Sequence, residues 1–167
     1  MNCKLEKLEL RFAADLAAAA GDKRVQDNLR DGLPFPYTVE NAREFIAAMG
    51  SSDEYIFAVT TDGRFAGCIS ATPQKNIHRL TAEVGYYIAP PFWGNGLATQ
   101  ALKLISEFVF ENTDIIRLYA EPFARNKASC RVLEKAGFCF EGTLKSNAVK
   151  NGVIEDMKMY ALIRRTT

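Results

Sequence analysis

Several kinds of chemistry are disfavoured by what this sequence lacks. It has a single histidine, His78, and four cysteines that form neither a Cys-x-x-Cys pair nor a cluster. A metal site is therefore not expected, because the usual ligands are too few and too scattered. The cysteines, at positions 3, 68, 130 and 139, are expected to be small buried hydrophobic residues and not nucleophiles.

The sequence also lacks an excess of charge of one sign. Its 21 Lys and Arg residues nearly balance its 20 Asp and Glu residues, so no basic stripe predicts nucleic-acid binding. No run approaches the roughly 18 apolar residues of a membrane span, and residues 1–12 do not resemble a signal peptide. We expect a cytoplasmic protein, monomeric or homodimeric, with one domain over residues 1–167.

Periodicity predicts an alternation of strands and helices along the chain. Capping and turn residues support several boundaries: Thr38 as a helix N-cap, and Asp62-Gly63 and Asn151-Gly152 as hairpin turns. A helix between two later strands favours one parallel pair in a mixed sheet. The predicted strands are 4–12, 54–61, 64–72, 80–89, 115–121, 138–145 and 153–163, and the predicted helices are 13–21, 38–49, 94–112 and 126–136.

The remaining elements are arranged around the segment 90–99, Pro-Pro-Phe-Trp-Gly-Asn-Gly-Leu-Ala-Thr. A strand enters it and a helix leaves it, and a helix start presents free N–H groups and a positive dipole end. Glycines at 94 and 96 allow a ligand to approach that backbone closely. The segment is either a phosphate cradle or a tight turn in which the glycines serve only the backbone conformation.

Two other phosphate-binding motifs fit this segment poorly. A dinucleotide fingerprint normally turns straight from strand to helix, whereas residues 90–93 intervene here, and the repeated βαβ units of that fold are absent. A Walker loop is excluded because no Gly-Lys-Ser/Thr follows.

Taken in order, several motifs resemble the GNAT superfamily of N-acetyltransferases, in its RimJ/RimL-like branch. They are Glu83 to Ile88, Trp93 to Thr99, Asn126 to Ser129, Val132 to Phe138 and Glu141-Gly142, which together span most of the chain. The resemblance implies an α+β fold, a central twisted mixed sheet of about seven strands flanked by about four helices. It also implies transfer of an acetyl group from acetyl-CoA to a primary amine by direct attack in a ternary complex.

The resemblance further implies where acetyl-CoA binds. Its pyrophosphate is expected on the N–H groups of the glycine loop, and its pantetheine arm along the preceding strand and near the Asn126 side chain. Asn126 would otherwise act only as a helix cap. The implied cofactor residues are Tyr87, Ile88, Trp93, Gly94, Asn95, Gly96, Leu97, Ala98, Thr99 and Asn126.

Acetylation of an amine requires loss of a proton, because an alkylammonium has a pKa near 10. Glu83 matches a position where the superfamily often has a glutamate acting through water, and Glu121 matches an acid used by some relatives, as base or as anchor for the acceptor ammonium. Both have an alternative as structural salt-bridge residues. Some RimL-like enzymes carry a glutamate where this chain has Ala148, which favours Glu83. His78 lies in a polar turn and is expected to be solvated.

Departure of the CoA thiolate benefits from one positioned donor, and Ser129 is the candidate, with helix capping as the alternative. The family suggests a backbone N–H near Ile88 for the oxyanion. The stiff loop 28–37 either inserts Phe35 into the core or forms an acceptor wall, with Phe35 and Tyr37 as contacts; acceptor selectivity is expected there and in 144–152. The acceptor is a protein N-terminus or a small amine. A noncatalytic acyl-CoA sensor is the alternative function.

Overall fold

The computed structural model describes residues 1–166 of the chain. Within that range the strands are β1 (Cys3–Lys7), β2 (Tyr55–Thr61), β3 (Arg64–Pro73), β4 (Thr81–Ile88), β5 (Arg117–Ala120), β6 (Cys139–Lys150) and β7 (Val153–Ile163). The α-helices are α1 (Ala13–Ala20), α2 (Lys23–Gln26), α3 (Val39–Ala48), α4 (Leu97–Asn112) and α5 (Lys127–Lys135). The short helix α2 is an addition to the four predicted ones.

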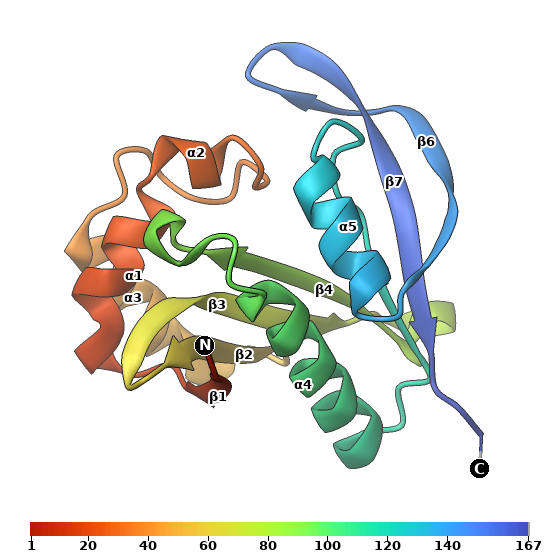
Figure 1. Cartoon of the computed structure of the whole chain (residues 1–167), viewed down its shortest axis with the longest axis horizontal. Coiled ribbons are helices and arrows are strands. Elements are labelled where there is room, and N and C mark those ends of the chain that lie inside the picture. The colour runs from red at the N-terminus through yellow and green to blue at the C-terminus, as the bar shows by residue number, and fades with distance from the viewer. Residues whose placement is uncertain (167) are drawn as a thin grey trace.

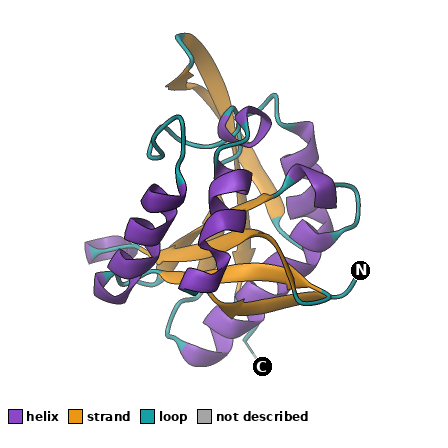
Figure 2. Ribbon diagram, turned by 90° about the vertical axis from the view of Figure 1, so that its left-hand side faces the viewer, coloured by secondary structure: helices purple, strands orange, loops and turns teal. Residues whose placement is uncertain are grey.

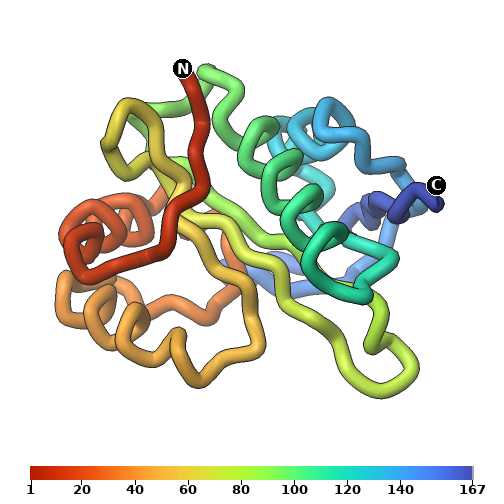
Figure 3. Tube along the Cα trace, turned by 90° about the horizontal axis from the view of Figure 1, so that it is seen from below, coloured from red at the N-terminus to blue at the C-terminus, as the bar shows by residue number. Residues whose placement is uncertain are grey.

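The strands form one mixed sheet in the order β1-β2-β3-β4-β5-β7-β6. Neighbouring strands are antiparallel except for β4 and β5, which are joined through helix α4 and run parallel, as predicted. Helices α1 and α3 lie on one side of the strands and α4 on the other (Figure 3). The hairpin of β6 and β7 extends beyond the rest of the sheet (Figures 1 and 2). Among residues 1–166, no helix is long and apolar enough to cross a membrane.

Each face of the sheet carries its own hydrophobic core. Helix α4 buries the side chains of one stripe almost completely, at the spacing i, i+3, i+4 that brings residues onto one helical face. These residues pack with the inward side chains of β3, β4 and β5, including Ile69, Val84 and Leu118. On the other face, Ala58, Cys68 and Tyr87 pack against α1 and α3. The two cores fix the sheet between two helical layers.

Turns and caps formed as the sequence indicates. Thr38 Oγ1 accepts the N–H of Asn41 at 3.1 Å, and Asn41 Oδ1 accepts the N–H of Thr38 at 2.9 Å, which completes a capping box for α3. The hairpin turns at Asp62-Gly63 and Asn151-Gly152 have positive φ at both residues, the conformation that a type I′ turn requires.

The first predicted strand is too long. β1 ends at Lys7, and residues Leu10–Phe12 form a 3-10 turn that leads into α1. Leu8 and Phe12 are both nearly fully buried, four residues apart, with the α1 helix packed beside them. Strand alternation would place Leu10 on the same face as Leu8 and Phe12, yet Leu10 is 62% exposed, so the 3-10 turn breaks the alternation that the sequence suggested.

The sixth strand is longer than predicted, because it continues past Lys145 to Lys150. Its pairing with β7 shifts register between Leu144 and Ala148. At this irregularity Ser146 has φ of +50°, and its N–H is accepted by Asp156 Oδ1 at 2.8 Å. The polar residues 145–147 therefore form a bulge, and pairing resumes beyond it.

Gly67 on β3 provides a test of how closely β3 and β4 approach. A Cβ at Gly67 would lie 2.2 Å from the Tyr87 carbonyl oxygen, whereas a Cβ at Gly85 would meet only Ser70 Oγ at 3.7 Å. We predict that Gly67→Ala lowers the free energy of unfolding by about 1–3 kcal/mol, the usual cost of overpacking. Gly85→Ala is the matched control, expected to stay within about 1 kcal/mol in urea unfolding. Equal effects of the two substitutions would contradict the prediction.

Candidate active site

The site is built where strands β4 and β5 part. The two strands pair only at Thr81–Arg117, Ala82–Leu118 and Glu83–Tyr119, within the described residues 1–166. Beyond Glu83, β4 continues to Ile88 beside β3, while β5 ends at Ala120. Part of β4 therefore has a strand neighbour on one edge only.

The hydrogen bonds at the two ends of β4 show which edge of the strand each backbone N–H and C=O group faces. The Leu80 carbonyl accepts a hydrogen bond from the Ile116 N–H on the β5 side. The Thr81 carbonyl and the Ala89 N–H form their hydrogen bonds on the β3 side. Because N–H and C=O groups alternate edges along a strand, those of Tyr86 and Ile88 face the side that β5 has left. The backbone of Tyr87 faces β3 instead, and its side chain is buried with α1 and α3.

The glycine loop lies just beyond the end of β4. Gly94 and Gly96 have φ of +77° and +73°, which L side chains rarely adopt, and α4 begins at Leu97. The first intrahelical bond is from Gln100 N–H to the Gly96 carbonyl, at 3.1 Å. Residues 94–99 thus have the conformation expected for a phosphate cradle, with the N–H groups of the first α4 turn left without helical partners.

Trp93 attaches this loop to the strand. Its indole N–H donates to the Ile88 carbonyl at 2.6 Å, so the loop is fixed beside the last residue of β4. Asn95 closes the turn from the other side, donating through Nδ2 to the Phe92 and Trp93 carbonyls at 3.1 and 3.0 Å. The side chains of Trp93 and Asn95 therefore shape the loop, which leaves its backbone N–H groups available.

Ser129 on helix α5 and Tyr86 on β4 bring their hydroxyl groups together where β4 and β5 separate. Ser129 Oγ lies 2.7 Å from the Tyr86 hydroxyl, and Asn126 Oδ1 accepts the Ser129 N–H at 3.1 Å, which caps α5. Burial raises the pKa of Tyr86 to about 12, so its phenol keeps its proton at neutral pH. Tyr86 can therefore donate to Ser129 Oγ and leave the serine proton free for another acceptor.

The opposite face of the sheet carries the two predicted carboxylates together. Glu83 and Glu121 both receive hydrogen bonds from the guanidinium of Arg30, which lies in the loop after α2. Arg30 Nη1 lies 3.2 Å from Glu83 Oε2, and Nη2 lies 3.2 Å from Glu121 Oε2 while also contacting Glu83 Oε1. One cation thus joins two acids that are 38 residues apart in sequence.

Glu121 has an altered acidity. Burial raises the pKa of its carboxyl above the ordinary value for glutamate, the charge of Glu83 raises it further, and Arg30 opposes both effects. Burial and the same two carboxylates also raise the pKa of Tyr119, which pairs with Glu83 across the strands. Two acids beside each other and partly shielded from water are a common arrangement at sites of proton transfer.

A cavity of ≈ 400 Å³ opens beside this cluster. The loop after α2, the segment after β5 and the last hairpin contribute its walls, so the two segments predicted to decide acceptor selectivity meet there. Its lining residues are Arg30, Asp31, Glu121, Phe123, Asn147, Ala148, Val149, Lys150 and Met157.

Polar contacts hold the loop against the hairpin. Lys150, which is buried, donates from Nζ to Asp31 Oδ1 at 2.5 Å. Arg125 donates to Asn28 Oδ1 at 2.7 Å and to Glu155 Oε1 at 2.7 Å, so it links the loop to β7. Both ends of the segment 28–31 are thus anchored, Asn28 to Arg125 and Asp31 to Lys150 of the last hairpin.

Sequence reasoning placed two loop aromatics less well. Phe35 is 64 % exposed, so it does not plug the core, and it does not line the cavity. Tyr37 is buried with α1 and α3. Their contact with an acceptor stays a prediction. Arg30, Lys150 and Tyr86 were missed as site residues; the charges flanking the loop were the only signal for Arg30.

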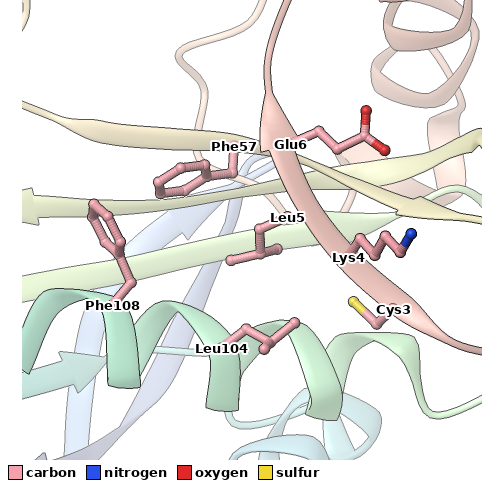
Figure 4. Close-up of a pocket in the computed structure, with 7 residues that line it drawn as sticks. All are labelled: Cys3, Lys4, Leu5, Glu6, Phe57, Leu104 and Phe108. Atoms are coloured by element: carbon pink, nitrogen blue, oxygen red, sulfur yellow. The ribbon is translucent and has the colours of Figure 1, made fainter. Parts of the chain in front are cut away.

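A second cavity of ≈ 400 Å³ lies between β1, β2 and α4, away from both carboxylates (Figure 4). Phe57 and Phe108 meet edge to face there, with ring centroids 5.1 Å apart. Burial raises the pKa of Cys3, which also lines it, to about 11, so the thiol is not a nucleophile at neutral pH. Cys68 and Cys130 are buried as expected, whereas Cys139 is exposed.

Two other expectations concern His78 and metal ions. His78 lies on the exposed turn Asn76–His78, as expected from its polar neighbours. Among residues 1–166, no group of three or more His, Cys, Asp or Glu side chains is arranged to hold a metal ion.

Comparison with known proteins identifies the family. The family model for the acetyltransferase (GNAT) domain matches residues 4–139. The chain belongs to the GNAT family of acetyltransferases. It is 35% identical over 133 residues to a probable N-acetyltransferase, YjcK, of Bacillus subtilis, covering 76% of this chain and 74% of that protein. It is 30% identical over 148 residues to spermidine N(1)-acetyltransferase of Escherichia coli, covering 89% and 77%.

A solved GNAT structure shows the same fold. RimL, a ribosomal L7/L12 alpha-N-protein acetyltransferase in complex with coenzyme A, aligns with a TM-score of 0.85 at 21% identity, covering 98% of this chain and 94% of that one. The seven-stranded mixed sheet is thereby confirmed, and this likeness in fold agrees with the RimJ/RimL-like resemblance. Membership of the acetyltransferase family confirms acetyl-CoA as the acetyl donor.

The Tyr86–Ser129 pair generates a prediction for this GNAT enzyme. We expect Ser129→Ala to lower kcat roughly 10- to 100-fold. This is at or below the rate contribution usual for a general acid, because a thiolate is a good leaving group even without protonation. Tyr86→Phe removes the donor to Ser129 Oγ and should lower kcat less, with no further loss when combined with Ser129→Ala.

Steady-state kinetics with acetyl-CoA check this. Tyr160→Phe is the control for loss of a buried tyrosine hydroxyl, since Tyr160 is bonded at 2.9 Å to Glu134 Oε1 and forms no hydrogen bond with Ser129. Additive effects of the two site substitutions would show that Tyr86 does not act through Ser129.

Proposed function

We propose that this enzyme acetylates a primary amine bound in the cavity between the α2 loop and the last hairpin, by direct attack in a ternary complex. The observation that carries the proposal is that Arg30 joins Glu83 and Glu121 where β4 and β5 separate, and that Arg30 and Glu121 line this cavity. Two carboxylates there attract a protonated amine and supply an acceptor for its proton.

The donor side uses the opposite face. The N–H groups of the glycine loop and the first turn of α4 would hold the pyrophosphate, while the free edge of β4 accompanies the pantetheine arm. Of the predicted cofactor residues, Ile88 has its N–H on that edge and would stabilise the oxyanion. Trp93, Asn95 and Leu97 shape the loop, and the backbone of Gly94, Gly96, Ala98 and Thr99 makes the contacts.

The reaction requires proton transfers on both faces of the sheet. Glu83, through water, takes the proton of the acceptor ammonium, and Glu121 anchors that ammonium and shares the charge. The free amine then attacks the thioester carbonyl, and as the carbon–sulfur bond breaks the nitrogen loses a second proton to water. Ser129, supported by Tyr86, passes a proton to the departing sulfur and regains one from water.

The acceptor class has two candidates, each named by a relative. The E. coli relative is a spermidine acetyltransferase, and the structural neighbour RimL is a protein acetyltransferase. A cavity of ≈ 400 Å³ suits a small amine or the end of a chain, since ligand sites commonly span about 300–1,000 Å³. The alternative function, a noncatalytic acyl-CoA sensor, is distinguished from the enzyme by one assay.

That assay follows thiol release from acetyl-CoA across a panel of polyamines, alkylamines, amino acids and N-terminal peptides, with mass detection of the acetylated product. We expect turnover on at least one primary amine, and a loss of about 10²–10⁴-fold in kcat/KM for Glu83→Gln. Binding of acetyl-CoA with no turnover on any acceptor would support the sensor instead.

The pH profile assigns the base. Activity needs an ionised carboxylate, so the rate falls as pH falls through its pKa, and the raised pKa of Glu121 would place its limb above the ordinary glutamate value of 4.5. Glu83→Gln removes the charge that helps raise the Glu121 pKa. If Glu121 is the base, the acidic limb of the pH–rate profile moves to lower pH in this variant. If Glu83 is the base, the acidic limb disappears.

A further inference from the structure

The cation between the two carboxylates comes from an exposed side chain. Arg30 is 61% exposed, whereas the side chains of Glu83 and Glu121 are 22% and 21% exposed. Among residues 1–166, Arg30 is the only basic residue that forms a salt bridge with either carboxylate. It therefore covers two partly shielded acids from the solvent side.

This guanidinium has the same chemical features as the substrate that the site is proposed to bind. An alkylammonium and a guanidinium both carry one positive charge and donate N–H bonds to carboxylate oxygens. Glu83 and Glu121 carry two negative charges, whereas Arg30 carries one positive charge. Arg30 therefore occupies the carboxylate oxygens without neutralising both carboxylates. An acceptor ammonium that approaches these oxygens must compete with Arg30 for them.

The loop allows this exchange without moving its backbone. Asn28 is held by Arg125 at 2.7 Å and Asp31 by Lys150 at 2.5 Å, on either side of Arg30. Arg30 has a long flexible stem that already faces water, so a change of its rotamer is enough to release the carboxylates. Exposed ion pairs are weak enough for such an exchange.

We propose, resting on the function proposed above, that Arg30 is a specificity-determining residue that occupies the ammonium position of the acceptor and must be displaced by it. A small amine that offers only an ammonium gains little by replacing Arg30. An amine whose body also fills the adjoining cavity gains apolar and polar contacts there, so it binds. Arg30 thus filters out simple amines in favour of those that match the cavity.

The test uses methylguanidinium as a non-acetylated probe and n-butylamine as a simple acceptor. In Arg30→Ala the carboxylates are uncovered, so methylguanidinium should bind about two- to fivefold more tightly than to wild type, the range expected for an exposed ion pair. It should also inhibit that variant competitively against n-butylamine, whose KM should fall by a similar factor. Arg30→Lys keeps the cation and should resemble wild type.

Arg11→Ala is the matched control. Arg11 is 57% exposed and also pairs with two glutamates, Glu6 at 2.7 Å and Glu9 at 3.1 Å, but away from the cavity. It should change neither methylguanidinium binding nor KM. Binding is measured by NMR titration and thermal shift, which need no turnover.

Two results would overturn the inference: methylguanidinium binding that is no tighter in Arg30→Ala, or a higher KM for n-butylamine, which would mean that Arg30 orients the acceptor. The proposed function fails separately. If wild type acetylates no amine although methylguanidinium binds the alanine variant more tightly, the cation site stands without the reaction.

Discussion

The short parallel pairing of β4 and β5 is the constraint on which the site depends. The strands are joined at three positions and separate immediately after Glu83 and Tyr119. Each strand is firmly held on its other edge, β4 by β3 and β5 by β7, so the sheet stays intact while its centre opens. An open main-chain edge inside a sheet normally needs hydrogen-bond partners. In this GNAT fold a bound cofactor can supply them.

Alternation along the strands then divides the chemistry between the two faces. Even-numbered residues of β4, such as Tyr86, pack on the face covered by α4 and α5, while Tyr87 packs against α1 and α3. Alternation places Glu83 on the same face as Tyr87. The hydroxyl pair proposed to serve the leaving thiol and the carboxylate pair proposed to serve the amine consequently lie on opposite sides of one strand. In the proposed reaction, proton removal and proton delivery are thereby kept apart, and the thioester would be attacked between them.

Much of this arrangement was predictable from the sequence because it depends on local signals. The strand, glycines and helix of residues 80–112 show the cradle, and Asn126 shows the start of α5. What the sequence did not show depends on tertiary contacts. Arg30 reaches carboxylates 53 and 91 residues away, and Tyr86 bonds a serine 43 residues away. No periodicity or motif carries such information.

The mistaken boundaries have the same origin. Leu8, Leu10 and Phe12 alternate with polar residues like a strand, yet Leu10 is exposed, because the chain forms a 3-10 turn that packs Leu8 and Phe12 beside α1. The predicted strand stops at Lys145, before the polar residues Ser146 and Asn147, but Asp156 on the partner strand binds the Ser146 N–H and pairing resumes beyond this bulge. In both places the neighbouring element decided between two conformations that the local sequence permits.

The most direct test is a crystal structure with a bisubstrate analogue, in which an alkylamine is joined to the sulfur of CoA through an acetyl bridge. We expect the pyrophosphate on the N–H groups after Gly94, the pantetheine arm along the free edge of β4, and the nitrogen of the alkylamine within hydrogen-bonding distance of Glu83 or Glu121, with Arg30 displaced. An amine directed away from both carboxylates, or an arm that does not pass between β4 and β5, would contradict this expectation.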